Sequence, residues 1–125
     1  MEVMEPTTDL TATGARLLAT AADSPSGRAA EQVFASPVLK AVLLGLREGA
    51  ALAEHRGPAA ATLQCLVGRA RLWSGEREWI LEAGGYAAVP SERHGVDALA
   101  DCVLLLTVAA GTAPEPVEVT LGRDG

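Results

Sequence analysis

Aromatic side chains are scarce in this 125-residue sequence: they make up 3% of it, as two tryptophans, one tyrosine and one phenylalanine. Basic side chains are also few, because 10 lysines and arginines stand against 16 acidic residues and the net charge is −6. A basic face that could meet phosphates is therefore not expected, which argues against nucleic acids and anionic membranes as partners. Hydrophobic residues still account for 49% of the chain, so we expect one domain with an aliphatic core and exclude wholesale disorder.

Cysteines and long apolar runs are also rare. Cys65 and Cys102 are the two cysteines, without CxxC spacing, and we expect two buried thiols there, with a structural disulfide as the alternative. The longest uncharged apolar run, residues 102–110, is too short to span a bilayer, and the N-terminal MEVMEPTTDL lacks the features of a signal peptide. We therefore expect a cytoplasmic protein in a reducing compartment, with no membrane partner.

The N-terminal residues 1–27 differ from the rest of the chain because they favour a helix. Thr8 or Asp9 can cap its start, and apolar residues recur at helical spacing from Leu10 to Ala21. The segment Ser24-Pro25-Ser26-Gly27 then ends it. The sequence therefore predicts a short helical extension before the main domain.

From residue 28 onward the pattern changes to eight or nine short extended segments separated by glycine and proline. The expected strands cover residues 31–35, 38–46, 50–55, 61–67, 69–73, 77–81, 86–89, 94–99 and 102–108. Trp73 and Trp79 alternate across the expected hairpin at 69–81, as core or interface anchors. This spacing predicts an all-β barrel or sandwich over residues 28–110. Residues 111–125 follow as a tail with a candidate edge strand at 117–121.

One of the two histidines belongs to a spaced set of glycines. Gly49, five residues, His55 and finally Gly68 match the first motif of the cupin family, G-x5-H-x-H-x3-E-x6-G. Two positions of that motif differ, because Gly57 replaces its second histidine and Ala61 replaces its glutamate. The glycine frame is therefore kept, while two of the three metal-ligating positions are lost.

The second histidine belongs to a similar set. Gly84, five residues and Pro90 match the start of the second cupin motif, G-x5-P-x-G-x2-H-x3-N, and His94 follows one position early. Glu92 replaces the glycine of that motif, and Ala98 or Leu99 replaces its asparagine. Over residues 38–110 the chain thus resembles a small single-domain cupin. The resemblance implies a cupin-like double-stranded β-helix, which is a jelly-roll barrel, after the short N-terminal helix.

The resemblance also implies a position for a divalent metal, which cupins hold with three ligands from the first motif and one from the second. Fe, Mn, Ni and Zn all suit imidazole and carboxylate ligands. This chain keeps His55 and His94 as candidate metal ligands. Catalytic metal sites use three protein ligands, so the sequence predicts a degraded centre that binds such an ion weakly. No catalytic residue is assigned.

Strand alternation extends the expected pocket. If Ala61 faces the interior, then Leu63, Cys65 and Val67 share its face, and Cys65 is a candidate third ligand. Glu92, in the loop before His94, can swing inward, and Tyr86 can contribute a hydroxyl group. The predicted ligand pocket consists of His55, Leu63, Cys65, Tyr86, Glu92 and His94.

Two functional hypotheses follow. The first is a protein that binds a small molecule in this interior pocket, and the alternative is a metal-dependent oxidoreductase of the dioxygenase type that uses His55 and His94. A homodimer built on strands outside the pocket is also expected, because short strands leave edges with unpaired backbone groups. The N-terminal helix and the tail are candidates to cover such an edge, within one subunit or across two.

Overall fold

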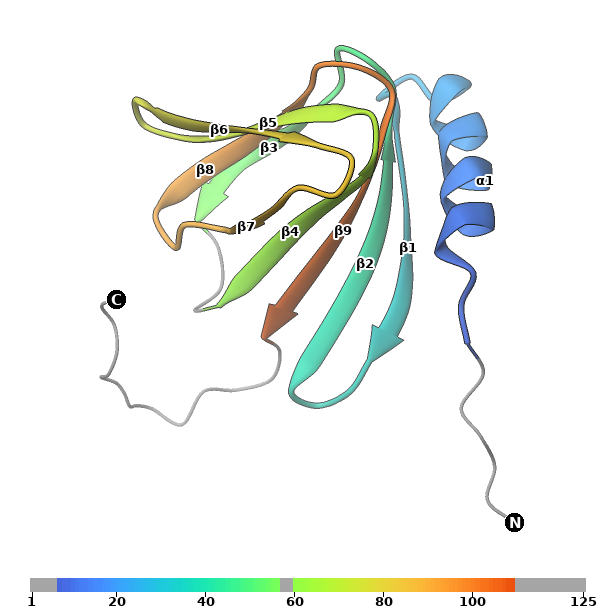
Figure 1. The fold of residues 1–125 in the computed structure, drawn as a ribbon, viewed down its shortest axis with the longest axis horizontal. Coiled ribbons are helices and arrows are strands. Elements are labelled where there is room, and N and C mark those ends of the chain that lie inside the picture. Colours follow the sequence, from blue (N-terminus) through green and yellow to red (C-terminus); the bar gives the residue numbers. More distant parts are fainter. Residues whose placement is uncertain (1–6, 57–59, 110–125) are drawn as a thin grey trace.

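The computed structural model describes residues 7–56 and 60–109, with the backbone alone for residues 53–56. Two antiparallel sheets face each other, and one helix, α1 (Leu10–Ala22), packs on the outside (Figure 1). The strands are β1 (Arg28–Ala35), β2 (Leu39–Leu46), β3 (Ala51–Arg56), β4 (Ala61–Val67), β5 (Arg69–Ser74), β6 (Arg77–Glu82), β7 (Tyr86–Ala88), β8 (Arg93–Ala98) and β9 (Cys102–Ala109). No helix within the described residues has the length and apolar character needed to cross a membrane.

The order of the strands brings distant parts of the chain together. The large sheet has the order β1-β2-β9-β4-β7, and the small sheet has the order β3-β8-β5-β6. β9 thereby lies between β2 and β4, so the last described strand is the central strand of the large sheet and joins its two halves. The predicted all-β barrel with an N-terminal helix is confirmed. The candidate strand at 117–121 lies outside the described residues.

The interior between the sheets is filled by inward side chains at alternate strand positions. Leu46, Leu63, Leu72 and Leu104 are all fully buried there. Val67 departs from the predicted alternation, because its side chain is 46% exposed. The pairing of β4 with β9 shifts register between Cys65 and Val67, and this irregularity turns Val67 away from the interior.

The helix α1 covers part of the outer face of the large sheet, where Leu17 packs with Leu43 and Val103 in a second, smaller apolar cluster. The Asp9 carboxylate caps the start of α1 by accepting a hydrogen bond from the backbone N–H of Ala12, at 3.0 Å. A Cβ atom added at Gly45 would lie 2.8 Å from the backbone of Leu17, so the absent side chain lets the helix approach closely. The helix therefore covers a sheet face, whereas the sequence suggested that it covers a strand edge.

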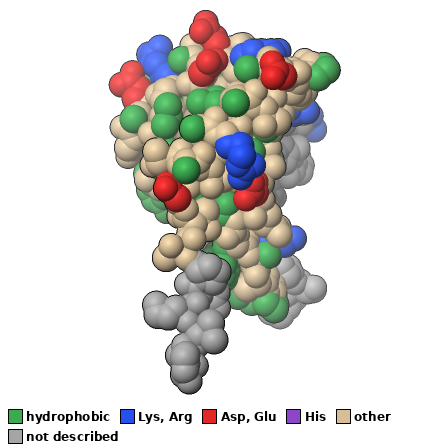
Figure 2. All heavy atoms as spheres, turned by 90° about the vertical axis from the view of Figure 1, so that its right-hand side faces the viewer, with side chains coloured by type: hydrophobic (Ala, Val, Ile, Leu, Met, Phe, Trp, Pro, Cys, Tyr) green, Lys and Arg blue, Asp and Glu red, His purple; other side chains and the backbone are tan. Residues whose placement is uncertain are grey.

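The surface on this side of the molecule carries charges of both signs. Figure 2, which faces α1, shows acidic and basic side chains interspersed with apolar ones. Arg16 of α1 pairs with Glu31 of β1 at 2.6 Å, and both side chains are exposed. Exposed pairs of this kind contribute little to stability, so the apolar cluster beneath the helix is what fixes its position.

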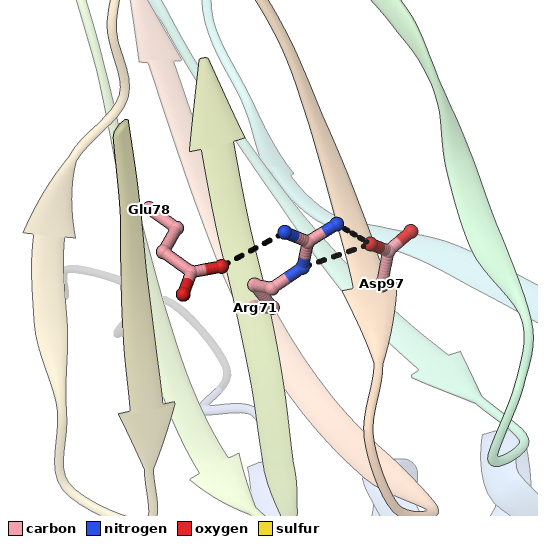
Figure 3. A network of polar contacts seen from close by, with 3 residues as sticks. All are labelled: Arg71, Glu78 and Asp97. Carbon is pink, nitrogen blue, oxygen red and sulfur yellow. Dashed lines mark hydrogen bonds and ion pairs between the residues drawn. The ribbon is translucent and has the colours of Figure 1, made fainter. Parts of the chain in front are cut away.

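The outer face of the small sheet carries a polar network across three strands (Figure 3). Arg71 of β5 donates to Glu78 of β6 at 2.8 Å and to Asp97 of β8 at 2.7 and 3.1 Å. These hydrogen bonds, first to Glu78 and then to Asp97, raise the pKa of Arg71 above its usual value. Trp73 lies on the same face against Gly95, where an added Cβ would come within 2.5 Å of the indole ring.

Candidate functional site

A cavity lies between the two sheets, at the end of the barrel where β3 ends and β4 begins. Its volume is about 40 Å³, counted as the space open to the centre of a water molecule. Because one water needs roughly 10–15 Å³ by this measure, the enclosed part has room for about three waters, and the cavity opens toward solvent, so a larger ligand can extend through its mouth. Among the described residues its lining is aliphatic or glycine apart from one imidazole and consists of Leu52, Ala61, Leu63, Leu72, Val89, His94, Gly95, Val96, Leu106 and Val108.

His94 is the polar side chain of this lining, and it is 4% exposed. Its Nδ1 lies 2.9 Å from the backbone carbonyl oxygen of Glu92. A carbonyl oxygen can only accept a hydrogen bond, so Nδ1 carries the proton. In the neutral ring, Nε2 is then the nitrogen with the lone pair, which can accept a hydrogen bond or ligate a metal.

The two histidines are brought together by strand pairing. His55 of β3 stands directly opposite His94 of β8 in the antiparallel register, just past an irregularity in that pairing. The backbone thus juxtaposes the two positions that the sequence motifs singled out. The side chain of His55 lies outside the described atoms, so its participation in the pocket stays a prediction.

Cys65 shares the inward face of β4 with Leu63 but lies deeper in the barrel. Leu63 lines the cavity, whereas the fully buried Cys65 thiol donates to the carbonyls of Val67 at 3.4 Å and Gly68 at 3.6 Å. Burial raises the pKa of this thiol. A metal ligand must be a thiolate, so this environment disfavours Cys65 as the third ligand.

The second cysteine is buried in the same region. Both Cys65 and Cys102 are free and fully buried. Burial, followed by the charges of Cys65 and Asp101, raises the pKa of Cys102 to about 12. Both thiols therefore keep their protons at neutral pH and act as small apolar side chains.

Two other predicted pocket residues lie at the surface. Tyr86 is 66% exposed at the start of β7, and the Glu92 side chain is 65% exposed and pairs with Arg77 at 3.6 Å. Neither side chain lines the cavity. Glu92 nevertheless contributes to the site through its backbone carbonyl, which holds His94.

Sequence reasoning missed most of the aliphatic lining, including Leu52 of β3 and both Leu106 and Val108 of β9. A signal for the β9 residues was present in the alternation of that strand, because they continue the inward face of Leu104. This alternation was not used, because the pocket was predicted mainly from polar side chains. The cavity is defined mainly by apolar residues that no chemical motif would reveal.

The residues of the cavity do not fit the metal centre that the fold resemblance implies. Ala61 lines the cavity at the position of the glutamate of the first motif, and its methyl group cannot ligate an ion. No group of three or more His, Cys, Asp or Glu residues that could hold a metal occurs among the described residues. His94 with His55 would supply two ligands, fewer than the three protein ligands of catalytic metal sites.

No protein-family model and no curated protein sequence matches the chain. Solved structures do match in fold. TT1209 from Thermus thermophilus has a TM-score of 0.65 and 25% identity, covering 90% of this chain and 100% of that one. An RmlC-like cupin from Desulfovibrio desulfuricans has a TM-score of 0.60 and 26% identity, covering 66% and 81%.

A third similar structure is a salicylate 1,2-dioxygenase from Pseudaminobacter salicylatoxidans. Its TM-score is 0.65 at 18% identity, and the match covers 77% of this chain and 32% of that one. Cupins and RmlC-like cupins recur among the other similar structures. What these proteins share with the chain is the arrangement of the two facing sheets.

Proposed function

We propose that this chain, which is a small cupin-type domain, binds a small and mainly apolar molecule carrying one polar group. The observation that carries the proposal is the composition of the cavity, whose described lining is aliphatic apart from one buried imidazole, His94. Apolar pockets with few polar groups are typical of small-molecule sites, where the polar group sets the orientation of the ligand. The cavity is better suited to binding a small molecule than to metal chemistry, because its described lining offers few side chains that can ligate a metal.

The imidazole also indicates the kind of polar group. With Nδ1 donating to the Glu92 carbonyl, the neutral ring presents an acceptor at Nε2. A ligand hydroxyl group can donate to that nitrogen. A carboxylate cannot donate, and it would lose its hydration in a cavity whose described lining carries no fixed positive charge.

Phenol, toluene and benzoate test this proposal, because they share one ring and differ in the polar group. We expect phenol to bind tightest by calorimetric titration or ligand-observed NMR. Ala61→Leu fills the cavity and is expected to weaken phenol at least about tenfold, since the ligand loses its space. Ala88→Leu, on the exposed face of β7, adds the same side chain outside the cavity and is the matched control.

Two outcomes contradict the proposal. Equal phenol affinity in Ala61→Leu and in the wild type would place binding outside the cavity. Stoichiometric Fe, Mn, Ni or Zn in the purified protein, lost in His94→Ala and His55→Ala, would instead favour the dioxygenase-type alternative. Elemental analysis of the three proteins makes that distinction.

The homodimer expected from the sequence remains a prediction. β1 and β7 form the edges of the large sheet, and β3 and β6 form those of the small sheet. An edge strand can pair with the same strand of a second copy. Light scattering at micromolar concentration is the measurement, and a mass near 12.8 kDa, the mass of one chain, would contradict the prediction.

A further inference from the structure

The orientation of the His94 ring depends in part on a backbone group. Its Nδ1 bonds the carbonyl of Glu92, which belongs to the connection between β7 and β8. The position of that carbonyl is set by whatever holds residues 92 and 93 in place. A contact that fixes this segment therefore acts on the imidazole without touching it.

Ser74 makes such a contact. Its hydroxyl group donates to the backbone carbonyl of Arg93 at 2.7 Å, and the residue is 6% exposed. The pairing of β5 with β8 runs as far as Trp73 opposite Gly95, and the chain then turns into the hairpin that leads to β6. The Ser74 side chain thus holds β8 one step beyond the end of the β5–β8 ladder, on the side opposite to β3, whose pairing with β8 continues to Arg56 opposite Arg93.

A second contact reaches the same segment from the same hairpin. The Arg77 guanidinium lies 3.6 Å from the Glu92 carboxylate and also lies over the Trp79 ring, 5.3 Å from its centroid. Both charged side chains of the pair are exposed, so solvent weakens this attraction. The hydroxyl group of Ser74 is the stronger constraint, because its residue is only 6% exposed and solvent weakens its 2.7 Å hydrogen bond less.

We propose that Ser74 is a positioning residue for His94. Its hydrogen bond to the Arg93 carbonyl holds the Glu92–His94 turn, which keeps the proton on Nδ1 and the lone pair on Nε2. The orientation of the ring is a property of the protein alone. Its effect on ligand affinity rests on the proposed function.

The tautomer of His94 is the readout, measured without ligand from the ring nitrogen shifts in long-range ¹H–¹⁵N NMR spectra. His55→Gln assigns the signals, because the chain has two histidines. In Ser74→Ala we expect the ratio of the Nδ1–H to the Nε2–H tautomer to fall about three- to tenfold, the value of one net hydrogen bond. Ser74→Thr restores the hydroxyl group and should restore the ratio.

Glu92→Gln is the matched control, because it removes the carboxylate and keeps the carbonyl that His94 uses. Its tautomer ratio should equal that of the wild type. If Ser74→Ala does not fold, Ser74→Cys keeps the size of the side chain with a weaker donor and should show the same direction of change. An unchanged ratio in either folded variant, or an equal change in Glu92→Gln, overturns the proposal.

Phenol binding to the same variants separates this proposal from the proposed function. We expect Ser74→Ala to weaken phenol about three- to tenfold, in step with the tautomer ratio. If the wild type binds no phenol while the ratio still responds to Ser74, the proposed function fails and the positioning role stands. If the wild type binds phenol and the ratio does not respond, the positioning role fails alone.

Discussion

The two ends of the barrel interior are built from the same strands but filled differently. On β9, Leu104 is fully buried in a filled core, whereas Leu106 and Val108 on the same face line a cavity. On β4, Cys65 belongs to the filled end and Ala61 to the cavity. On β9 the alternation of inward side chains continues through both ends. Alternation therefore determines which side chains face the interior, but not whether they pack against another side chain there.

The difference comes from a small side chain at the cavity end. Ala61 occupies the motif position of a glutamate and contributes only a methyl group to the lining. At the filled end, Leu46, Cys102 and Leu104 pack together without exposure to solvent. The cavity in this barrel is therefore made by omitting side-chain volume while the frame of strands stays unchanged.

Two leucines on one face of β9 test this difference most directly. Leu104→Ala should lower the free energy of unfolding by about 3–5 kcal/mol, because a fully buried leucine leaves a new cavity. Leu106→Ala should cost about 1–2 kcal/mol, because its side chain already borders open space and loses fewer contacts. Urea unfolding of both variants measures the two losses.

Equal losses in the two variants would mean that the two ends are packed alike. An unchanged m-value serves as the control, because it shows that the variants differ in stability and not in the extent of unfolding.

The Cys102 thiol makes the filled end sensitive to high pH. Its pKa is raised from 9.0 to about 12 in the folded protein, so the native state retains a proton that the unfolded state releases above pH 9. The stability it supplies is complete below about pH 9 and is lost as the pH rises toward 12, by at most about 1.4 kcal/mol per pH unit.

Cys102→Ala should show a shallower fall in unfolding free energy between about pH 9 and 11 than the wild type. Lysine and tyrosine also titrate in this range, but they are common to both proteins and cancel in the difference. Identical slopes would mean that the thiol titrates alike in the folded and unfolded chains.

The smallest effect is expected outside both ends of the interior. Arg71→Lys leaves one compact ammonium where a planar guanidinium bonds Glu78 and Asp97 together, so one of the two contacts should be lost. The midpoint of urea unfolding should fall slightly, and the change should shrink in 1 M salt because exposed charges are screened. Phenol affinity should stay unchanged. A loss as large as that of Leu104→Ala would contradict this ranking.

The frame of the protein could be predicted from local sequence signals. Glycine and proline breaks marked the strands, and the spacing of Gly49, His55, Gly84 and Pro90 indicated the cupin fold, which is confirmed. Strand alternation failed at Val67, because a register irregularity depends on the partner strand β9 and leaves no local trace. Pairing between distant strands is a property of the whole chain.

The site was harder to predict than the frame. Polar residues were expected to line the pocket, yet the structure places the side chains of Tyr86 and Glu92 at the surface. His94 bonds the backbone carbonyl of Glu92, and the hydroxyl group of Ser74 bonds the neighbouring carbonyl of Arg93. A backbone acceptor has no signature in the sequence, because every residue carries one.

The packing of α1 on the large sheet has a consequence for how the chain folds during synthesis. Leu17 rests partly on Val103 of β9, the last strand described, so the helix is synthesised long before one part of the surface that holds it. A 13-residue helix containing Gly14 is marginal in water on its own. Most of its packing is against β1 and β2, and the contact with β9 is added when β9 enters the sheet between them and β4. The helix is therefore secured in two steps, first against strands that follow it closely in the chain and then against β9, and loss of β9 in a truncated chain would loosen it.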